Sequence, residues 1–335
     1  MKVIKRSFPK SRLRRTRMRS FSRRMVSENN FTINDVIWPV FLVENSKSKS
    51  QIKTMPNVYR YPIEVLLKEL EKPIKQGLNA IALFPHISDD KKDEEGSYAL
   101  SSKNVICKSL KRIKQEYPNI GVICDVALDP YTSHAHDGII SNGKVDNDNS
   151  LKKLVEQALL LADSGADILA PSDMMDGRVG RIRQSLEEKE YYDTMIMSYA
   201  AKYSSSLYGP FREAVNAGKL IEPKNKKSYQ MDIANIDEAM HEVAMDISEG
   251  ADMIMIKPGL PYLDVISKAK ELFSMPTFAY QVSGEYSMIM SAVKNNHLEE
   301  LDTILETMFC FKRAGADGIF TYFTPQILDA LSNIS

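Results

Sequence analysis

Residues 252–259 read DMIMIKPG, an apolar run that ends in lysine, proline and glycine. Seven similar short runs lie at 36–43 (VIWPVFLV), 80–85 (AIALFP), 120–128 (IGVICDVAL), 167–174 (DILAPSDM), 194–202 (TMIMSYAAK), 276–284 (PTFAYQVSG) and 317–323 (DGIFTYF). Runs that are apolar at consecutive positions predict strands covered on both faces, and parallel strands of this kind need helical crossovers. Because helical patterns fill the intervals, the sequence predicts eight βα units, the content of a (β/α)8 TIM barrel.

A weak internal repeat supports this count. The segments ADSGADILAP, ISEGADMIMIKP and KRAGADGIFTY each place a glycine and then Ala-Asp ahead of an apolar run. These glycines, Gly165, Gly250 and Gly315, are predicted to end helices in a left-handed conformation. The alternative is an open doubly wound sheet, but no G-x-G-x-x-G motif follows the first run and no phosphate loop occurs, so the barrel is favoured.

Composition limits the class of protein. The 335 residues are 43% hydrophobic and 26% charged, which excludes a wholly disordered, collagenous or coiled-coil chain. The net charge is zero and no apolar run approaches the ~20 residues that span a bilayer, so neither nucleic acid nor membrane is an expected partner. Three cysteines at wide spacing fit no disulfide framework, and there is no secretory signal, so a reducing, cytoplasmic location is expected.

Residues 1–34 are predicted to form an arm outside a catalytic barrel at 35–335. Residues 1–24 carry eleven Lys and Arg, and the first acid is Glu28. Three interpretations remain open: a nucleic-acid tail, an organelle-targeting segment, or an arm that grips a partner subunit. The last is favoured because apolar anchors, which a purely electrostatic tail would not need, lie in the arm at Phe8, Pro9, Leu13, Met18 and Phe21.

Two of the predicted strands end in lysine, at Lys202 and Lys257. In a barrel of this type catalytic groups gather at the carboxyl ends of the strands. Burial and the repulsion between two neighbouring ammonium groups both lower a lysine pKa, and a neutral amine is the nucleophile that attacks a ketone. Either lysine taken singly could merely extend its amine into solvent, but the pair predicts Schiff-base chemistry.

Polar residues follow two other predicted strands. Residues 124–138, CDVALDPYTSHAHDG, place three carboxylates and two imidazoles together, and residues 171–178 add further acids and a hydroxyl. Such a segment suits a metal or proton-transfer site, although a solvated loop is the simpler alternative. Residues 203–230 are interrupted by Gly and Pro and are predicted to form a lid, in which Arg212 and Lys226 bind a substrate carboxylate.

With these residues in place, the sequence resembles the porphobilinogen synthase (δ-aminolevulinic acid dehydratase) family over nearly its whole length. Seven blocks in order carry the resemblance: LRRTRMRSF, CDVALDPYTSHAHDG, LAPSDMMDGRVGRIR, MSYAAKYSSSLYGPFR, EGADMIMIKPGLPYLD, YQVSGEY and TYFTPQIL. The resemblance implies a (β/α)8 barrel whose N-terminal arm wraps a neighbouring subunit in a homo-octamer. It also implies condensation of two 5-aminolevulinate molecules to porphobilinogen, with loss of two waters, for tetrapyrrole (heme) biosynthesis.

The resemblance also implies residue roles. Lys257 matches the lysine that forms an imine with the first substrate, and Lys202 the lysine that does so with the second. Asp125 and Ser172 match polar groups beside these lysines. The remaining matches are substrate contacts: Ser283 and Tyr322 for the first carboxylate, Arg212, Lys226 and Gln230 for the second, and Tyr208 and Phe211 as aromatic walls.

Some family members bind catalytic zinc through three cysteines in this region, where the present chain has Ala127, Asp129 and Asp137. Alanine cannot ligate, and carboxylates favour hard cations over a thiolate-type zinc site. The resemblance therefore implies the aspartate-rich, zinc-independent branch, with Asp129 and Asp137 at the substrate site and no active-site zinc. It also implies an allosteric Mg2+ bound by Glu242.

Two other functions compete with this one. A lysine-dependent aldolase on the same barrel needs only one lysine, whereas this chain offers two lysines and two carboxylate clamps. A nucleic-acid-binding protein would use the basic arm, but the remainder is neutral and lacks interleaved aromatic and basic residues.

Overall fold

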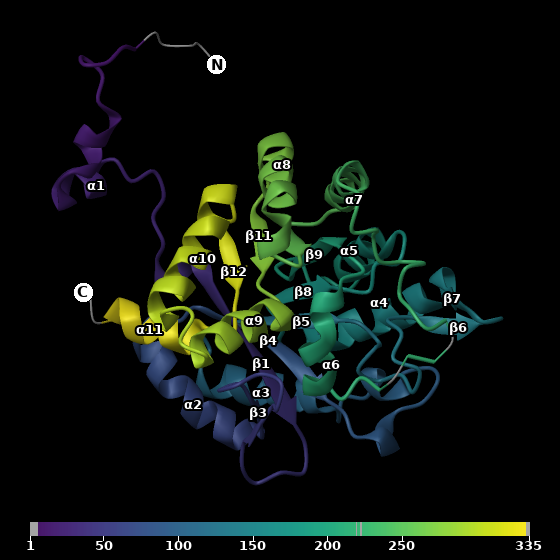
Figure 1. Ribbon diagram of the computed structural model, residues 1–335. Helices are drawn as coiled ribbons and strands as arrows, with labels where there is room; N and C mark the ends of the chain where they lie inside the picture. The colour runs from purple at the N-terminus through teal and green to yellow at the C-terminus, as the bar shows by residue number, and fades with distance from the viewer. Residues whose placement is uncertain (1–5, 219, 222, 333–335) are drawn as a thin grey trace.

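Eight parallel strands close into a barrel in the computed structural model, which describes residues 6–218, 220–221 and 223–332 (Figure 1). The strands are β1 (Val36–Val43), β4 (Ala80–His86), β5 (Gly121–Val126), β8 (Ile168–Pro171), β9 (Met195–Lys202), β10 (Met253–Lys257), β11 (Thr277–Tyr280) and β12 (Gly318–Phe320). Each pairs with the next, and β12 pairs back onto β1 with Val36 opposite Ile319. All eight predicted strands are present, so the predicted barrel is confirmed.

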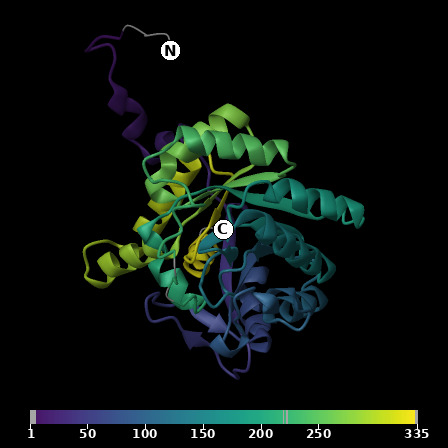
Figure 2. The same cartoon turned by 90° about the vertical axis from the view of Figure 1, so that its right-hand side faces the viewer.

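Helices surround the strands (Figure 2). In chain order they are α2 (Ile63–Lys75), α3 (Val105–Glu116), α4 (Asn147–Asp163), α5 (Arg178–Glu188), α6 (Gly209–Ala214), α7 (Asp237–Ser248), α8 (Leu263–Phe273), α9 (Ser283–Lys294), α10 (Glu300–Ala314) and α11 (Thr324–Ser332). Short strands β2 (Ser50–Gln51) and β3 (Tyr59–Tyr61) extend the sheet beside β1. These two strands were not predicted.

Some predicted boundaries were wrong. The run at 276–284 ends as a strand at Tyr280, and Ser283 instead begins α9. The polar composition of residues 141–150, SNGKVDNDNS, predicts a surface loop, but this stretch includes strand β7 (Lys144–Asp146) and the start of α4. Strand β7 pairs with β6 (Ile139–Ser141) across Asn142 and Gly143, whose φ angles of 51° and 72° suit a tight hairpin turn.

The three glycines of the internal repeat end helices as predicted. Gly165, Gly250 and Gly315 have φ angles of 104°, 102° and 101°, which only glycine adopts without strain. They follow α4, α7 and α10, and each is succeeded within three residues by a barrel strand. The repeat therefore marks the point where a crossover helix turns back into the barrel.

The aspartate of each repeat joins two neighbouring strands. Each aspartate directly precedes one barrel strand, and its carboxylate accepts the backbone N–H at the start of the neighbouring barrel strand that comes earlier in the chain. A Lys or Arg side chain forms an ion pair with each of these carboxylates. The bonds join Asp167 to Val122, Asp252 to Ile196 and Asp317 to Thr277, each at 2.7 Å. The repeated Gly-Ala-Asp therefore fixes strand register at the amino-terminal end of the barrel, opposite the site.

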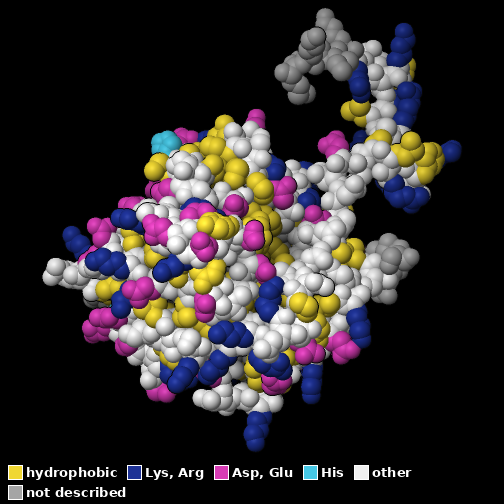
Figure 3. Space-filling model, turned by 180° about the vertical axis from the view of Figure 1, so that it is seen from behind, with side chains coloured by type: hydrophobic (Ala, Val, Ile, Leu, Met, Phe, Trp, Pro, Cys, Tyr) yellow, Lys and Arg dark blue, Asp and Glu magenta, His cyan; other side chains and the backbone are white. Residues whose placement is uncertain are grey.

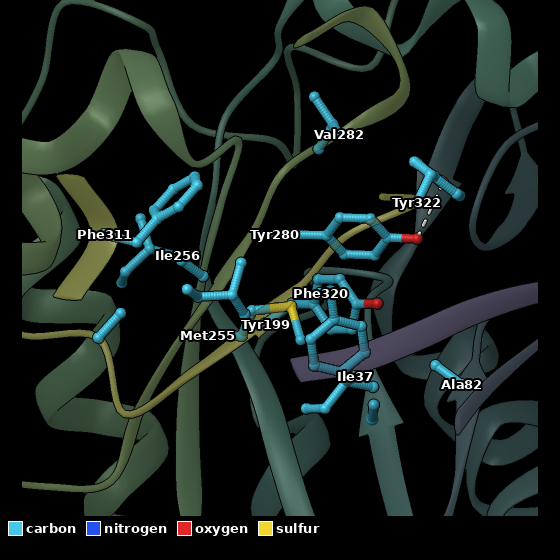
Figure 4. Close-up of a cluster of buried hydrophobic side chains, with 14 of the residues drawn as sticks. Ile37, Ala82, Tyr199, Met255, Ile256, Tyr280, Val282, Phe311, Phe320 and Tyr322 are labelled. Atoms are coloured by element: carbon cyan, nitrogen blue, oxygen red, sulfur yellow. Dashed lines mark hydrogen bonds between the residues drawn. The ribbon is translucent and has the colours of Figure 1, made fainter. Parts of the chain in front are cut away.

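Side chains fill the barrel interior (Figure 4). Ile37, Ala82, Tyr199, Met255 and Phe320 come from five different strands and are all buried. A barrel of eight strands is wide enough for such layers and leaves no central pore. The three cysteines are unpaired.

The arm carries a short 3-10 turn (Leu13–Arg17) and α1 (Ser20–Met25), and it projects from the barrel (Figures 1 and 3). Its apolar side chains stay exposed, with Phe8 at 75% and Met25 at 79%. Phe31 packs edge-on against Phe309 of α10, which ties the base of the arm to the barrel. No helix in the described part of the chain is both long and apolar enough to cross a membrane.

Candidate active site

Lys202 and Lys257 lie side by side at the carboxyl end of the barrel. Each is the last residue of its strand, β9 or β10, and the parallel pairing places the two residues directly opposite each other. Both side chains are at least nine-tenths buried. The predicted pair of neighbouring lysines is therefore present.

The Lys257 amine is surrounded by aromatic rings. Its Nζ lies 4.6 Å from the ring centroid of Tyr280, 4.9 Å from Tyr199, 5.1 Å from Phe211 and 5.4 Å from Tyr208. Among the described residues, none forms a hydrogen bond or ion pair with this amine. Burial, and then the charge of Lys202, lower the pKa of Lys257 to about 7. Near neutral pH much of this amine is therefore uncharged.

The Lys202 amine has a different environment. It lies 3.0 Å from Oδ1 of Asp137 and also donates to the carbonyl oxygen of Ser172. The other oxygen of Asp137 lies 2.5 Å from the Lys226 amine. Burial alone would raise the pKa of Asp137, but the two lysine charges hold it well below its usual value. The Asp137 carboxylate thus stays ionised and bridges two cations.

Lys226 connects the predicted lid segment (203–230) to Asp129 and Asp137. Its amine also lies 3.2 Å from Oδ2 of Asp129. Burial opposes the charged form, yet Asp129 and Asp137 together raise the pKa of Lys226, so the amine stays protonated. From the same segment the Tyr229 hydroxyl donates to Asp137 at 2.9 Å. The predicted lid segment is therefore held in place by contacts to both aspartates.

Asp125 is a half-buried residue whose carboxylate has an incomplete set of hydrogen-bond partners among the described residues. It lies on β5, and its Oδ1 has no hydrogen-bond partner among the described residues. Burial, and then the charge of Asp129, raise its pKa to about 6 despite the nearby lysines. The Ser172 hydroxyl hydrogen-bonds to it. A carboxyl with this pKa can both accept and release a proton near neutral pH.

A cavity lies between the strand ends and the lid. Its empty volume, which includes space open to solvent, is about 430 Å³. Eight predicted site residues line it: Asp129, Lys202, Tyr208, Phe211, Arg212, Lys226, Gln230 and Lys257. The three residues predicted to bind the second carboxylate, Arg212, Lys226 and Gln230, therefore all line the same cavity, and their role as a clamp stays a prediction.

The predicted clamp for the first carboxylate lies one layer behind this cavity. The Ser283 hydroxyl accepts the Phe211 N–H at 2.9 Å, so it already has a partner. The Tyr322 hydroxyl lies 3.0 Å from that of Tyr280, as the dashed line in Figure 4 shows. Neither Ser283 nor Tyr322 lines the cavity. Each contacts one of the aromatic residues beside the Lys257 amine, Ser283 contacting Phe211 and Tyr322 contacting Tyr280.

Comparison with known proteins agrees with this geometry. Residues 10–330 match the family model described as delta-aminolevulinic acid dehydratase. The chain belongs to the delta-aminolevulinic acid dehydratase family. It is 51% identical to the enzyme of that name from Bradyrhizobium diazoefficiens, over 96% of this chain and 90% of that protein. It is 44% identical to the one from Rhodobacter capsulatus, over 97% and 98%.

A solved structure of the same family has a closely similar fold. It is the delta-aminolevulinic acid dehydratase (porphobilinogen synthase) from Toxoplasma gondii, in complex with the reaction product porphobilinogen. The two chains superpose with a TM-score of 0.95 at 40% identity, covering 97% of this chain and 92% of the other.

Glu242, the predicted magnesium ligand of this dehydratase-family chain, lies on α7 outside the first cavity. It is half-buried and lines a second hollow beside the lid and the β6–β7 hairpin. Burial raises its pKa against the opposing charge of Arg178. Within the described ranges, no three His, Cys, Asp or Glu side chains gather as metal ligands. Mg2+ usually keeps several waters and takes one or two carboxylates, so a single carboxylate such as that of Glu242 is compatible with this ion. The assignment of a magnesium site to Glu242 stays a prediction.

Three features of this site were not predicted from the sequence. Tyr199 and Tyr280, which face the Lys257 amine, had the pattern of ordinary buried strand residues. Tyr229 was noted only as part of the lid, yet it donates to Asp137. His136 lies 3.0 Å from the Tyr229 hydroxyl and contacts the Pro223 carbonyl oxygen at 2.8 Å. The polar segment at 124–138 was the available signal for His136.

Proposed function

We propose that this protein is a porphobilinogen synthase, which condenses two molecules of 5-aminolevulinate to porphobilinogen with loss of two waters. The observation that carries this function is the Lys257 amine, which is buried among four aromatic rings, has no counter-ion among the described residues, and lies opposite Lys202 in register. A neutral amine adds to the ketone carbon of the first substrate, and uptake of one proton with loss of water leaves a protonated imine.

The imine acts as an electron sink for the following steps. It acidifies the neighbouring carbon, and Asp125, with a pKa raised to about 6, is placed to take up the proton that leaves. The second substrate is oriented by its carboxylate against Arg212 and Lys226. Since the two substrates are identical, asymmetric joining depends on holding each in its own pose.

The two lysines are suited to different parts of this reaction. Lys257 has a lowered pKa and no anionic partner within the described part of the chain, whereas Lys202 is bound to Asp137. Lys202 is held by its contact with Asp137, whose carboxylate stays ionised, whereas the Lys257 amine is available to add to a ketone. This difference supports Lys257 as the first amine to capture substrate.

We assign the chain to the aspartate-rich branch of the family without active-site zinc. Asp129 and Asp137 each bind a lysine amine, which gives these carboxylates a role that needs no metal. We further propose an allosteric Mg2+ at Glu242, a homo-octamer held by the N-terminal arm, and a cytoplasmic location, with organelle targeting by the arm as the alternative.

The function is tested by incubating the purified protein with 5-aminolevulinate and measuring pyrrole with an acidic aldehyde reagent. We expect pyrrole from the wild type and from Lys189→Met, which alters an exposed lysine, and none from Lys257→Met. A folded wild-type protein that forms no pyrrole would contradict the proposal and favour a lysine-dependent aldolase.

A further inference from the structure

Glu285 is a buried carboxylate for which the mechanism above has no use. It lies in the first turn of α9 with an exposure of 0%. Its Oε1 accepts the N–H of Leu260 at 2.7 Å. Its Oε2 accepts the N–H groups of Val282 at 2.8 Å and Gly259 at 3.2 Å. A carboxyl group so far from water is costly unless it is hydrogen-bonded, and here backbone donors satisfy it.

These bonds join two separate segments of the chain. Gly259 and Leu260 form the turn that directly follows Lys257, and Val282 leads into α9. The turn is packed tightly, because a Cβ on Gly259 would lie 2.6 Å from the Phe311 ring and 2.8 Å from the Tyr280 carbonyl oxygen. The end of β10 is therefore fixed by Glu285 against the start of α9.

The start of α9 also holds the base of the lid. Ser283 Oγ accepts the N–H of Phe211, and a Cβ on Gly284 would lie 2.5 Å from the carbonyl oxygen of Leu207. The Phe211 ring is one of the four around the Lys257 amine. The first turn of α9 thus contacts two backbone segments: the turn that follows Lys257 and the segment that carries the Phe211 ring.

We propose that Glu285 is a positioning residue for the Lys257 amine. By holding the turn after β10 and the start of α9 together, it keeps the amine inside its aromatic enclosure. Lysine has a long flexible side chain, so the position of its amine depends on a fixed backbone and close walls. Misplacement of a reacting group by about 1 Å can lower a rate by about 100-fold. This inference rests on the proposed role of Lys257 in imine formation.

The test compares two substitutions with a matched control. In Glu285→Gln, an NH2 group that cannot accept an N–H replaces one of the two oxygens, and Glu285→Asp keeps the charge but shortens the reach. The control is Asn104→Ala, which removes another buried helix cap, the side chain that accepts the Cys107 N–H at the start of α3. Each full-length variant is incubated with 5-aminolevulinate and borohydride at a temperature where circular dichroism shows it folded. The initial rate of labelling at Lys257 is then measured by peptide mass mapping.

We expect labelling at Lys257 to fall about 10- to 100-fold in Glu285→Gln and by a smaller factor in Glu285→Asp. Asn104→Ala should label at the wild-type rate even though its melting temperature is lower. Labelling at the wild-type rate in either folded Glu285 variant would overturn the assignment of Glu285 as a positioning residue. If Glu285→Gln does not fold, the rate measured for Glu285→Asp decides the question. A wild-type protein that is never labelled at Lys257 would instead overturn the proposed function, and this inference with it.

Discussion

Asp137 lies 3.0 Å from the amine of Lys202, and both side chains are buried. Lys257, directly opposite on the next strand, has no such partner among the described residues. Two identical side chains at equivalent strand ends are thereby placed in different electrostatic environments. One amine is ion-paired with a carboxylate, and the other is neutral for much of the time near pH 7.

The rate of imine formation at Lys257 should depend on pH. Its pKa is lowered to about 7, so the neutral fraction falls about tenfold for each unit below pH 7 and levels off above it. We expect the rate of borohydride trapping at Lys257 to follow this fraction. The measurement is the initial trapping rate from pH 5.5 to about 9.

The same experiment on Lys202→Met isolates the repulsion between the two lysines. Lys202 helps to lower the pKa of Lys257, so its removal should move the midpoint of the trapping profile to higher pH. Lys189→Met, at an exposed position, should leave the midpoint in place. An unchanged midpoint in Lys202→Met would show that burial alone sets the pKa of Lys257.

Asp137→Asn should destabilise the protein. The substitution leaves the buried amines of Lys202 and Lys226 without their shared anion, and breaking a buried pair in this way typically costs about 3–5 kcal/mol. Urea unfolding at pH 7 measures the loss, with the exposed Asp193→Asn as control.

The loss of stability in Asp137→Asn should depend on pH, because the pKa of Asp137 is lowered in the folded protein. Its contribution to stability is fully present above its unfolded pKa of about 4, and it is lost as the pH falls toward the folded value. The difference between wild type and Asp137→Asn should therefore narrow in acid. An equal difference at pH 7 and pH 3 would contradict the assigned ionisation.

Arg212→Lys should raise KM more than it lowers kcat. Arg212 lines the cavity, where its planar guanidinium can bind a substrate carboxylate through two parallel hydrogen bonds. Lysine offers only a point charge, so we expect KM for 5-aminolevulinate to rise about tenfold, equivalent to about 1.4 kcal/mol. Arg181→Lys, an exposed change on α5, is the matched control. An unaltered KM would remove Arg212 from the clamp.

Deleting residues 1–24 should give smaller assemblies and lower activity. The arm exposes Phe8, Leu13 and Met25 by more than half, which favours a partner surface over solvent. Sedimentation velocity measures the assembly. A Phe8→Ser and Leu13→Ser double variant should dissociate in the same way, whereas neutralising Arg14 and Arg15 with glutamine should have less effect. Unchanged assembly after deletion would contradict the partner-arm interpretation.

The barrel itself was predictable from local pattern. Eight apolar runs and the repeated Gly-Ala-Asp are properties of short segments, and parallel closure then brings Lys202 and Lys257 to the same end without further information. Asp125 and Arg212 could be named from the resemblance, and the structure places both close to the lysines.

The enclosure of Lys257 was not predictable in the same way. Tyr199 and Tyr280 are buried strand residues by pattern, and only the closed barrel shows that their rings face the amine. Glu285 was not singled out by any sequence pattern, and its bonds to Gly259 and Leu260 cross 25 residues or more of chain. Such contacts depend on tertiary packing, which single-sequence patterns do not encode.

The most direct test of the account is to trap the first covalent intermediate on the wild-type protein. Borohydride is added during incubation with 5-aminolevulinate at neutral pH, and the labelled peptides are identified by mass. The account predicts a substrate-derived mass on Lys257 at early times, ahead of any label on Lys202. Early label on Lys202 alone, or no label on either lysine in a protein that still turns over substrate, would contradict it.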